Sequence, residues 1–396
     1  MQKATLAKAG VGGAVALALG LGAFSPAAYA DVQPRSTDAV AIGSDTVQFI
    51  GDFGADGDTG GDLGYNAVNT SHRLFSFDAT SDASGRTGYV NGTSTALASS
   101  VVLRAGTKPI VRPNGSGAGI TALLADTTHQ IDFVRSSRLP KQSEQTSAAA
   151  VAFGGIHVFQ IATDGLAIAA ATTTNSPAGL SAAELANIYN GTYKKWSEVP
   201  GYSGSHGSDG IVPVIPQTGS GTRNDFIADI KTQTGIDLTN TLASNVKVAE
   251  EHDPTGITGV ATGTDVNGNP VSAADAISPF SVGRFNLINS AYFGTTPAPN
   301  TIQLETGTAP DASAAYFLQR HLYLLARQSD VTSTTPFQTG GSANLVNTLF
   351  GKASSWFGKA ANAPLFNAAG GNPAATNPNL VGVSQAWQDL SFAFSG

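Results

Sequence analysis

The chain contains no cysteine among its 396 residues. This absence excludes disulfide bonds, thiolate metal sites, cysteine nucleophiles and lipid attachment to a cysteine. Charged residues are also scarce at 12%, about half of the roughly 25% of an average soluble protein. With 21 Lys and Arg against 28 Asp and Glu, the net charge is −7. The negative electrostatic field of such a chain is unfavourable for binding nucleic acids or anionic membranes.

After the first thirty residues, no segment reaches 18 uncharged apolar residues. At the start, two lysines precede an uncharged run over residues 9–24, and Ala28-Tyr29-Ala30 supplies small residues where a signal peptidase cleaves. The run is shorter than the roughly 20 residues that a membrane-spanning helix needs. We therefore predict that residues 1–30 are a secretory signal peptide cleaved before Asp31. The mature protein is expected to be secreted, without a lipoprotein cysteine.

The rest of the chain alternates short apolar runs with helical patterns. Hydrophobic residues make up 41%, and the length exceeds that of one average domain, so we expect two lobes. Alternation of strands and helices predicts an α/β fold with largely parallel sheets. Residues 52–62 are expected to form a Gly-rich acidic loop and residues 366–380 another loop. The predicted strands are 39–42, 101–104, 109–111, 131–134, 156–171, 211–215 and 322–325.

Three loops share one design, in which a strand leads through Ser, Thr and Gly into a helix. They are Ser44-Asp45-Thr46, Gly115-Ser116-Gly117 and Gly219-Ser220-Gly221-Thr222. A helix N-terminus presents unpaired backbone N–H groups and about half a positive charge. Glycine lets an anion approach the backbone, and hydroxyls donate further hydrogen bonds. All three loops follow strands, so they are expected at the carboxyl ends where α/β sheets bind ligands. The pattern predicts an anion site and is not a Walker A motif.

Arginine is the preferred bidentate partner of a tetrahedral oxyanion. Arg223 falls in the first turn of the helix that follows the third loop, and Arg135 ends the strand at 131–134. We expect both to contact the anion, together with Ser136 and Ser137. Arg138 is expected to be a surface charge or an ion-pair partner instead.

These motifs, taken in order, resemble the phosphate-binding protein of bacterial Pst-type phosphate ABC transporters. The resemblance covers about residues 41–327. Its most distinctive parts are the stretch from Leu180 to Trp196 and the Gly-Ser-Gly-Thr-Arg run at 219–223. The resemblance implies a two-lobed fold of the type 2 periplasmic-binding-protein kind, with a hinge of two crossing strands. Lobe one is then expected over 31–158 and 326–396, and lobe two over 159–325.

The resemblance also implies a function, namely capture of phosphate or a related oxyanion between the lobes for transporter uptake or scavenging. The protein would act without catalysis, cofactor or metal, as a monomer, with a membrane ABC permease as partner. The sequence departs from the family pattern at two positions that bear on selectivity for phosphate. Ser137 stands where many members have a proton-accepting Asp, and Pro216 stands where many have an Arg. Asp45 is the preferred substitute acceptor, with Glu251 and Asp253 as alternatives. The predicted ligand-binding residues are Ser44, Asp45, Thr46, Ser116, Gly117, Arg135, Ser136, Ser137, Ser220, Gly221, Thr222 and Arg223.

Two other functions remain open from the residues alone. A hydrolase would use Ser220 or Ser116 as nucleophile with His252 and Asp253, although no histidine stands in a known catalytic spacing. An extracellular adhesion or carbohydrate-binding protein could be built on the same scaffold, because fold does not settle function.

Overall fold

The computed structural model describes residues 34–80, 100–151, 153–290, 292–294, 297–306, 315–332, 345–371 and 381–395. The predicted signal peptide lies outside these residues. Within them, no helix has both the length and the apolar character needed to cross a membrane.

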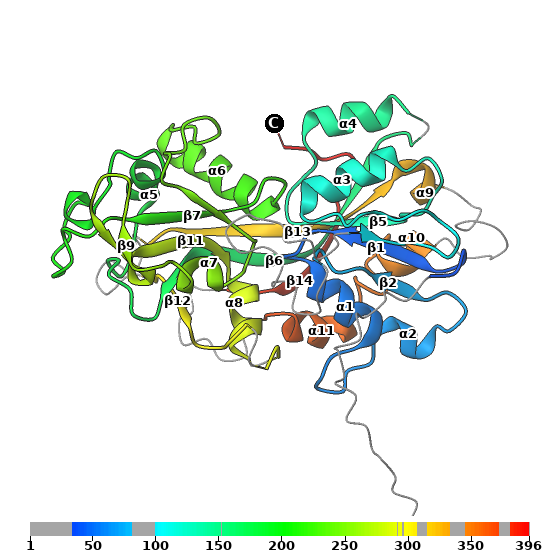
Figure 1. Cartoon of the computed structure of the whole chain (residues 1–396). Coiled ribbons are helices and arrows are strands. Elements are labelled where there is room, and N and C mark those ends of the chain that lie inside the picture. Colours follow the sequence, from blue (N-terminus) through cyan, green and yellow to red (C-terminus); the bar gives the residue numbers. More distant parts are fainter. Residues whose placement is uncertain are drawn as a thin grey trace, which may run out of the picture. The chain divides into compact units, whose positions relative to one another are not determined.

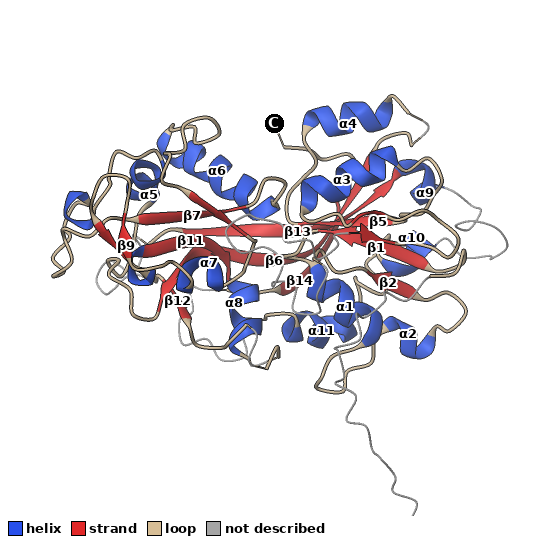
Figure 2. Ribbon diagram, in the orientation of Figure 1, coloured by secondary structure: helices blue, strands red, loops and turns tan. Residues whose placement is uncertain are grey.

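One mixed sheet forms the centre of the fold, with the strand order β2-β1-β5-β13-β6-β11-β7-β8 (Figures 1 and 2). Two long strands, β6 (Ile156–Ala171) and β13 (Phe317–Arg327), lie in its middle and pair antiparallel along the whole of β13. Their central position matches the predicted pair of crossing strands. The lobe boundaries predicted at 158/159 and 325/326 fall inside these two strands and stay a prediction.

Lobe one is built around β1, β2 and β5, which are parallel to one another. Apolar side chains fill both faces of this half, because helices cover each face. One face packs against α1, α2, α10 and α11, and the other against α3 and α4. The bounds are β1 Ala39–Gly43, α1 Gln48–Asp56, α2 Tyr65–Val68, β2 Leu74–Ser76, β3 Ser100–Val101, β4 Ile110–Val111, α3 Ser116–Ala125, β5 Phe133–Ser136, α4 Gln142–Ala149, α9 Gln328–Thr332, α10 Leu345–Leu349, η4 Ala360–Asn362, α11 Ala363–Ala368 and β14 Ser384–Asp389.

Lobe two repeats this plan around β7, β8 and β11, which also pair parallel. Helices α5 and α6 cover one face, and α7 and α8 cover the other. The bounds are α5 Ala182–Tyr189, η2 Trp196–Glu198, β7 Val212–Pro216, α6 Gly221–Thr234, β8 Lys247–Ala249, α7 Thr255–Thr258, β9 Gly263–Thr264, β10 Pro270–Val271, η3 Ala273–Asp275, β11 Ala276–Ser281, α8 Val282–Asn289 and β12 Ile302–Leu304.

The structure confirms the α/β class and corrects three details. The sheet is parallel within each lobe, but every pair that involves β6 or β13 is antiparallel, so "largely parallel" was too broad. Strands β6 and β13 cross between the lobes in opposite directions, so they pair antiparallel. Residues 52–56 belong to α1 rather than to a loop, because Phe49, Ile50 and Phe53 give that segment a buried apolar face. Residues 366–368 likewise end helix α11, and residues 372–380 lie outside the described residues.

Candidate functional site

The loops before α3 and α6 bring the two lobes into direct contact. Gly115 has a φ of 98°, and a Cβ there would lie 2.6 Å from the Gly219 carbonyl oxygen. The Gly117 N–H donates to that same carbonyl at 3.1 Å. A Cβ on Gly221 would collide with the hydroxyl oxygens of Ser116 and Ser137. These glycines are therefore required for the close approach of backbone from opposite lobes.

The hydroxyl of Ser220 is the N-cap of α6. Its oxygen accepts a hydrogen bond from the Arg223 N–H at 3.0 Å, as Ser, Thr, Asp and Asn do at helix starts. Because the cap uses only the oxygen lone pair, the hydroxyl hydrogen stays available as a donor. Across the cleft, Ser116 Oγ lies 3.3 Å from Ser137 Oγ and accepts from the Ser137 N–H at 3.0 Å.

A buried carboxylate already occupies the meeting point of the two lobes. Thr46 from lobe one and Thr222 from lobe two both donate to Glu251 Oε1, at 2.5 Å and 3.0 Å. The two threonine oxygens lie 3.3 Å apart, and all three side chains are buried. Burial alone would raise the pKa of Glu251, but hydrogen bonds from His252, Ser220 and Thr46 hold it well below its ordinary range. Hydroxyls from separate lobes thus converge on one negative charge.

His252 completes this network as a hydrogen-bond donor. Its Nδ1 accepts from the Ser281 N–H at 3.3 Å, which places the ring proton on Nε2. Nε2 lies 3.0 Å from Thr46 Oγ1 and 3.2 Å from Glu251 Oε1. Burial lowers the pKa of His252, so the ring is neutral near pH 7. Its φ of 61° is unusual for a residue with a side chain, a strain of the kind found at functional sites.

Two buried arginines adjoin this network, Arg320 through Thr222 and Arg284 through Asp45. Arg320 Nη1 donates to Thr222 Oγ1 at 2.7 Å, while its other nitrogens hold Asp164 at 2.9 and 3.1 Å. Arg284 lies 3.8 Å from Asp45, with its guanidinium 4.3 Å from the centre of the Phe49 ring. Both guanidinium groups are therefore paired with buried carboxylates of the protein.

Asp45, Glu251 and His252 could each offer one ligand atom to a metal ion, all within 4.8 Å of one another. The surroundings argue against a cation. Glu251 is held by hydroxyl donors, and Arg284 and Arg320 stand beside the two carboxylates. The charges of the acids are therefore balanced by protein groups.

Two predicted ligand contacts need correction. Arg135 is fully buried inside lobe one, where it donates to Ser76 Oγ and the Phe77 carbonyl at 2.6 Å each and to the Ser44 carbonyl at 3.4 Å. It therefore supports the Ser44 loop from behind. Arg223 turns back to the Pro216 carbonyl at 2.9 Å and closes the end of β7.

The remaining predicted residues take several places. Ser136 donates to the Arg138 carbonyl at 2.6 Å and shapes its own turn. Arg138 forms the expected ion pair, with Glu144 at 2.8 Å. Asp253 accepts from Thr255 at the start of α7. Helix α1 begins at Gln48 after Val47, so Ser44-Asp45-Thr46 forms the turn before it and does not cap it through a side chain.

The sequence did carry a signal for Arg284, which the sequence analysis missed. Ser281 ends β11, caps α8, and accepts from the Arg284 N–H at 3.1 Å. This repeats the relation of Ser220 to Arg223 at α6, so a fourth strand-Ser-helix unit was present. Arg320 could be suspected from its place as a charge within the apolar strand β13.

Comparison with known proteins identifies the family. The family model described as "PBP superfamily domain" matches residues 83–330, more than half of the chain. The chain belongs to the PBP superfamily. No curated protein matched it.

Similar solved structures include a protein from Clostridium perfringens described as a phosphate ABC transporter substrate-binding protein with bound phosphate. It is 15% identical, with a TM-score of 0.49, and the match covers 84% of this chain and 98% of that one. An ABC-type phosphate transport receptor from Vibrio cholerae is 17% identical, with a TM-score of 0.45 and the same coverage. PstS from Borrelia burgdorferi is 12% identical, with a TM-score of 0.39, covering 84% of this chain and 97% of that one.

Proposed function

We propose that this protein is a solute-binding protein that captures phosphate or a related tetrahedral oxyanion between its two lobes. The observation that carries the proposal is the donor set around Glu251. Thr46 and Thr222 reach the carboxylate from opposite lobes, and His252 and Ser220 donate to it as well. Hydrogen-bond donors that hold a buried carboxylate can hold the oxygens of another oxyanion in its place.

An incoming anion would replace the Glu251 carboxylate in this arrangement. Ser116 and Ser137 line the same meeting point and offer further hydroxyls, and Arg320 donates to Thr222 Oγ1, which leaves the Thr222 hydroxyl hydrogen free to donate to the anion. Hinge closure of two lobes around a ligand is an established mode of such folds. Affinity would come from several charge-assisted hydrogen bonds in a site shielded from water.

Hydrolysis is disfavoured by the histidine tautomer. A general base needs a free lone pair on the nitrogen that faces the nucleophile. Here Nε2 of His252 faces Thr46 and Thr222 and carries the proton, because Nδ1 accepts from the Ser281 N–H. Asp253 accepts from the N–H and the hydroxyl of Thr255 at the start of α7. The protein is accordingly proposed to act without catalysis. We further propose that the protein is secreted and delivers its ligand to a membrane ABC permease.

Titration calorimetry with inorganic phosphate tests the donor set. Thr46→Val and Thr222→Val keep the side-chain shape and remove one donor each. A hydrogen bond to a charged group is worth about 1.5–3 kcal/mol, so each variant should lose about 10- to 100-fold in affinity. Thr258→Val is a matched control, because its hydroxyl only donates to the Pro254 carbonyl on α7. Unchanged affinity in both site variants, or no phosphate binding at all, would refute the proposal.

A further inference from the structure

A buried ion pair joins the two crossing strands β6 and β13. Asp164 on β6 and Arg320 on β13 lie directly opposite each other in the strand register, and both side chains are buried. Arg320 donates to Asp164 Oδ2 through Nε at 3.1 Å and through Nη2 at 2.9 Å. Two bonds to one carboxylate fix the plane of a guanidinium group, so the direction of its third nitrogen is fixed as well.

The third nitrogen of Arg320 points to the anion site. Arg320 Nη1 donates to Thr222 Oγ1 at 2.7 Å, at the start of α6. A guanidinium group has donors only, so Thr222 accepts this bond and its own hydroxyl hydrogen must point elsewhere. That hydrogen is directed to Glu251 Oε1, 3.0 Å away, which is the position proposed for an anion oxygen. Arg320 therefore decides the direction in which the Thr222 hydroxyl donates.

Asp164 also ties the start of helix α8 to the crossing strands. Its second oxygen, Oδ1, accepts from the Gly283 N–H at 3.0 Å. Two residues earlier, Ser281 caps α8 and uses its N–H for His252 Nδ1 at 3.3 Å. One carboxylate in the middle of the fold thus holds the start of α8 directly and the start of α6 through Arg320.

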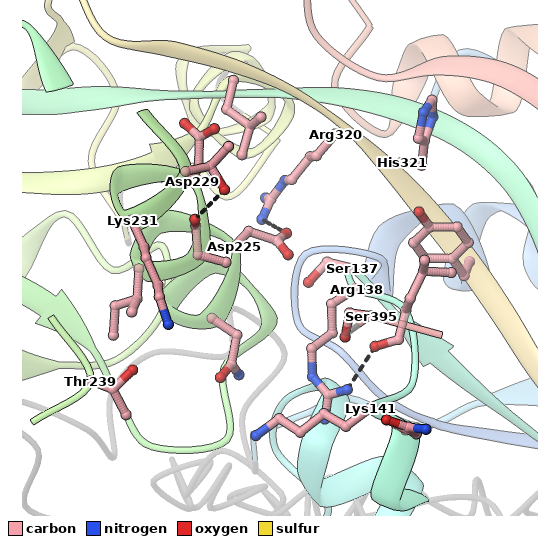
Figure 3. A pocket seen from close by; sticks show the side chains of 18 of the residues that line it. Ser137, Arg138, Lys141, Asp225, Asp229, Lys231, Thr239, Arg320, His321 and Ser395 are labelled. Atoms are coloured by element: carbon pink, nitrogen blue, oxygen red, sulfur yellow. Dashed lines mark hydrogen bonds and ion pairs between the residues drawn. The ribbon is translucent and has the colours of Figure 1, made fainter. Parts of the chain in front are cut away.

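Asp225 is the second carboxylate beside Arg320. Figure 3 shows the Arg320 side chain directed toward Asp225 on α6, and Nη1 lies 3.4 Å from Asp225 Oδ2. This contact is longer than the bond to Thr222, so Thr222 is the stronger partner of Nη1. Because Asp164 and Asp225 surround the guanidinium group, the protein itself balances the positive charge. The effect of Arg320 on an anion is therefore expected to come through the direction of the Thr222 hydroxyl and not through net charge.

We propose that Arg320, held in place by Asp164, is a positioning residue of the anion site. It acts through Thr222, whose hydroxyl it fixes as a hydrogen-bond donor toward the ligand, and it does not touch the anion. This inference rests on the proposed function, since the donor is useful only to a bound anion.

A double-mutant cycle with inorganic phosphate tests this role by titration calorimetry on the full chain. Arg320→Lys keeps the positive charge, but one ammonium group cannot replace a planar fork that binds Asp164 and Thr222 together. We expect phosphate affinity to fall at least fivefold in the parent background. In the Thr222→Val background the same change should cost less than twofold, because the hydroxyl that Arg320 directs is absent. Equal losses in both backgrounds would overturn the proposal.

Arg327→Lys is the matched control for a general loss of packing. Arg327 lies on the same strand, is buried, and binds two carboxylates, Asp126 at 2.8 Å and Asp330 at 3.2 Å. The control should lower the thermal midpoint as Arg320→Lys does, and it should leave phosphate affinity within twofold. If it weakens phosphate binding as much as Arg320→Lys does, the positioning role is refuted.

Asp164→Asn tests the same link from β6 and keeps the side-chain shape. It should weaken phosphate binding at least threefold, and it should add less than twofold to the loss in Arg320→Lys, because both residues act through one contact. Unchanged affinity in Asp164→Asn would overturn the role given to Asp164. A parent protein that binds no phosphate would refute the proposed function and this inference together, whereas additive losses in a parent that binds phosphate would refute this inference alone.

Discussion

The role of Glu251 gives the sharpest prediction. If its carboxylate stands where the anion binds, an incoming anion must expel a negative charge or remain beside it. Replacing it in Glu251→Gln keeps the side-chain size and an oxygen that can accept from Thr46 and Thr222. Only the charge and one acceptor are lost. We therefore expect this variant to bind anions more tightly than the parent protein.

The magnitude follows from Coulomb's law. Two like unit charges about 4 Å apart repel by about 4 kcal/mol at the effective dielectric constant of about 20 that suits such sites. Part of this repulsion is avoided in the parent, because Glu251 can move aside or take up a proton when the anion enters. We expect a gain of at least tenfold in affinity, equivalent to about 1.4 kcal/mol.

Calorimetry with phosphate and sulfate at pH 7 and fixed ionic strength measures this gain. Glu198→Gln is the control, because it removes the same charge from lobe two at a residue that binds the backbone of Lys194 and Lys195. Sulfate carries no proton at this pH, so it should gain at least as much as phosphate. Weaker binding of both anions in Glu251→Gln would refute this prediction, because it would show that the carboxylate assists the ligand.

Three further predictions concern closure, the buried arginine and pH. Gly221→Ala should weaken phosphate binding at least tenfold, because the added Cβ would meet the hydroxyls of Ser116 and Ser137. Gly263→Ala is the control, because open space surrounds Gly263 and phosphate binding should not change. Equal affinities of the two variants would contradict the tight approach of the lobes. Arg284→Met should lower the free energy of unfolding by about 3–5 kcal/mol in urea titrations, since it breaks the buried ion pair between Arg284 and Asp45. A loss below about 1 kcal/mol would count against the pair. Burial raises the pKa of Asp225 to about 7 despite Arg320, so the folded state binds more protons there than the unfolded state between about pH 4 and 7. The stability that Asp225 contributes should fall as pH rises through that window and level off above pH 7. Asp225→Asn should therefore show a smaller fall in thermal midpoint than the parent protein over this pH range. Identical plots of thermal midpoint against pH for the two proteins would refute this prediction.

The sequence by itself determined the fold class and the loops of the cleft. Alternating apolar runs and turn residues required strands followed by helices, and Ser220 and Ser181 cap α6 and α5 because their side chains suit helix starts. The Gly-Ser-Gly runs at 115–117 and 219–221 likewise predicted turns before helices from their own residues. These features depend on neighbouring residues along the chain, so a sequence pattern can show them.

Tertiary structure alone decided which side chains meet between the lobes. Arg223 follows a predicted loop and Arg135 ends a predicted strand, yet their guanidinium groups bind carbonyls within their own lobes. Glu251, Arg284 and Arg320 come from three distant segments, and the antiparallel crossing of β6 and β13 is what brings the two lobes' loops together. Their partnership arises from burial, where each charge must find a partner, and no local pattern specifies which distant residue supplies it.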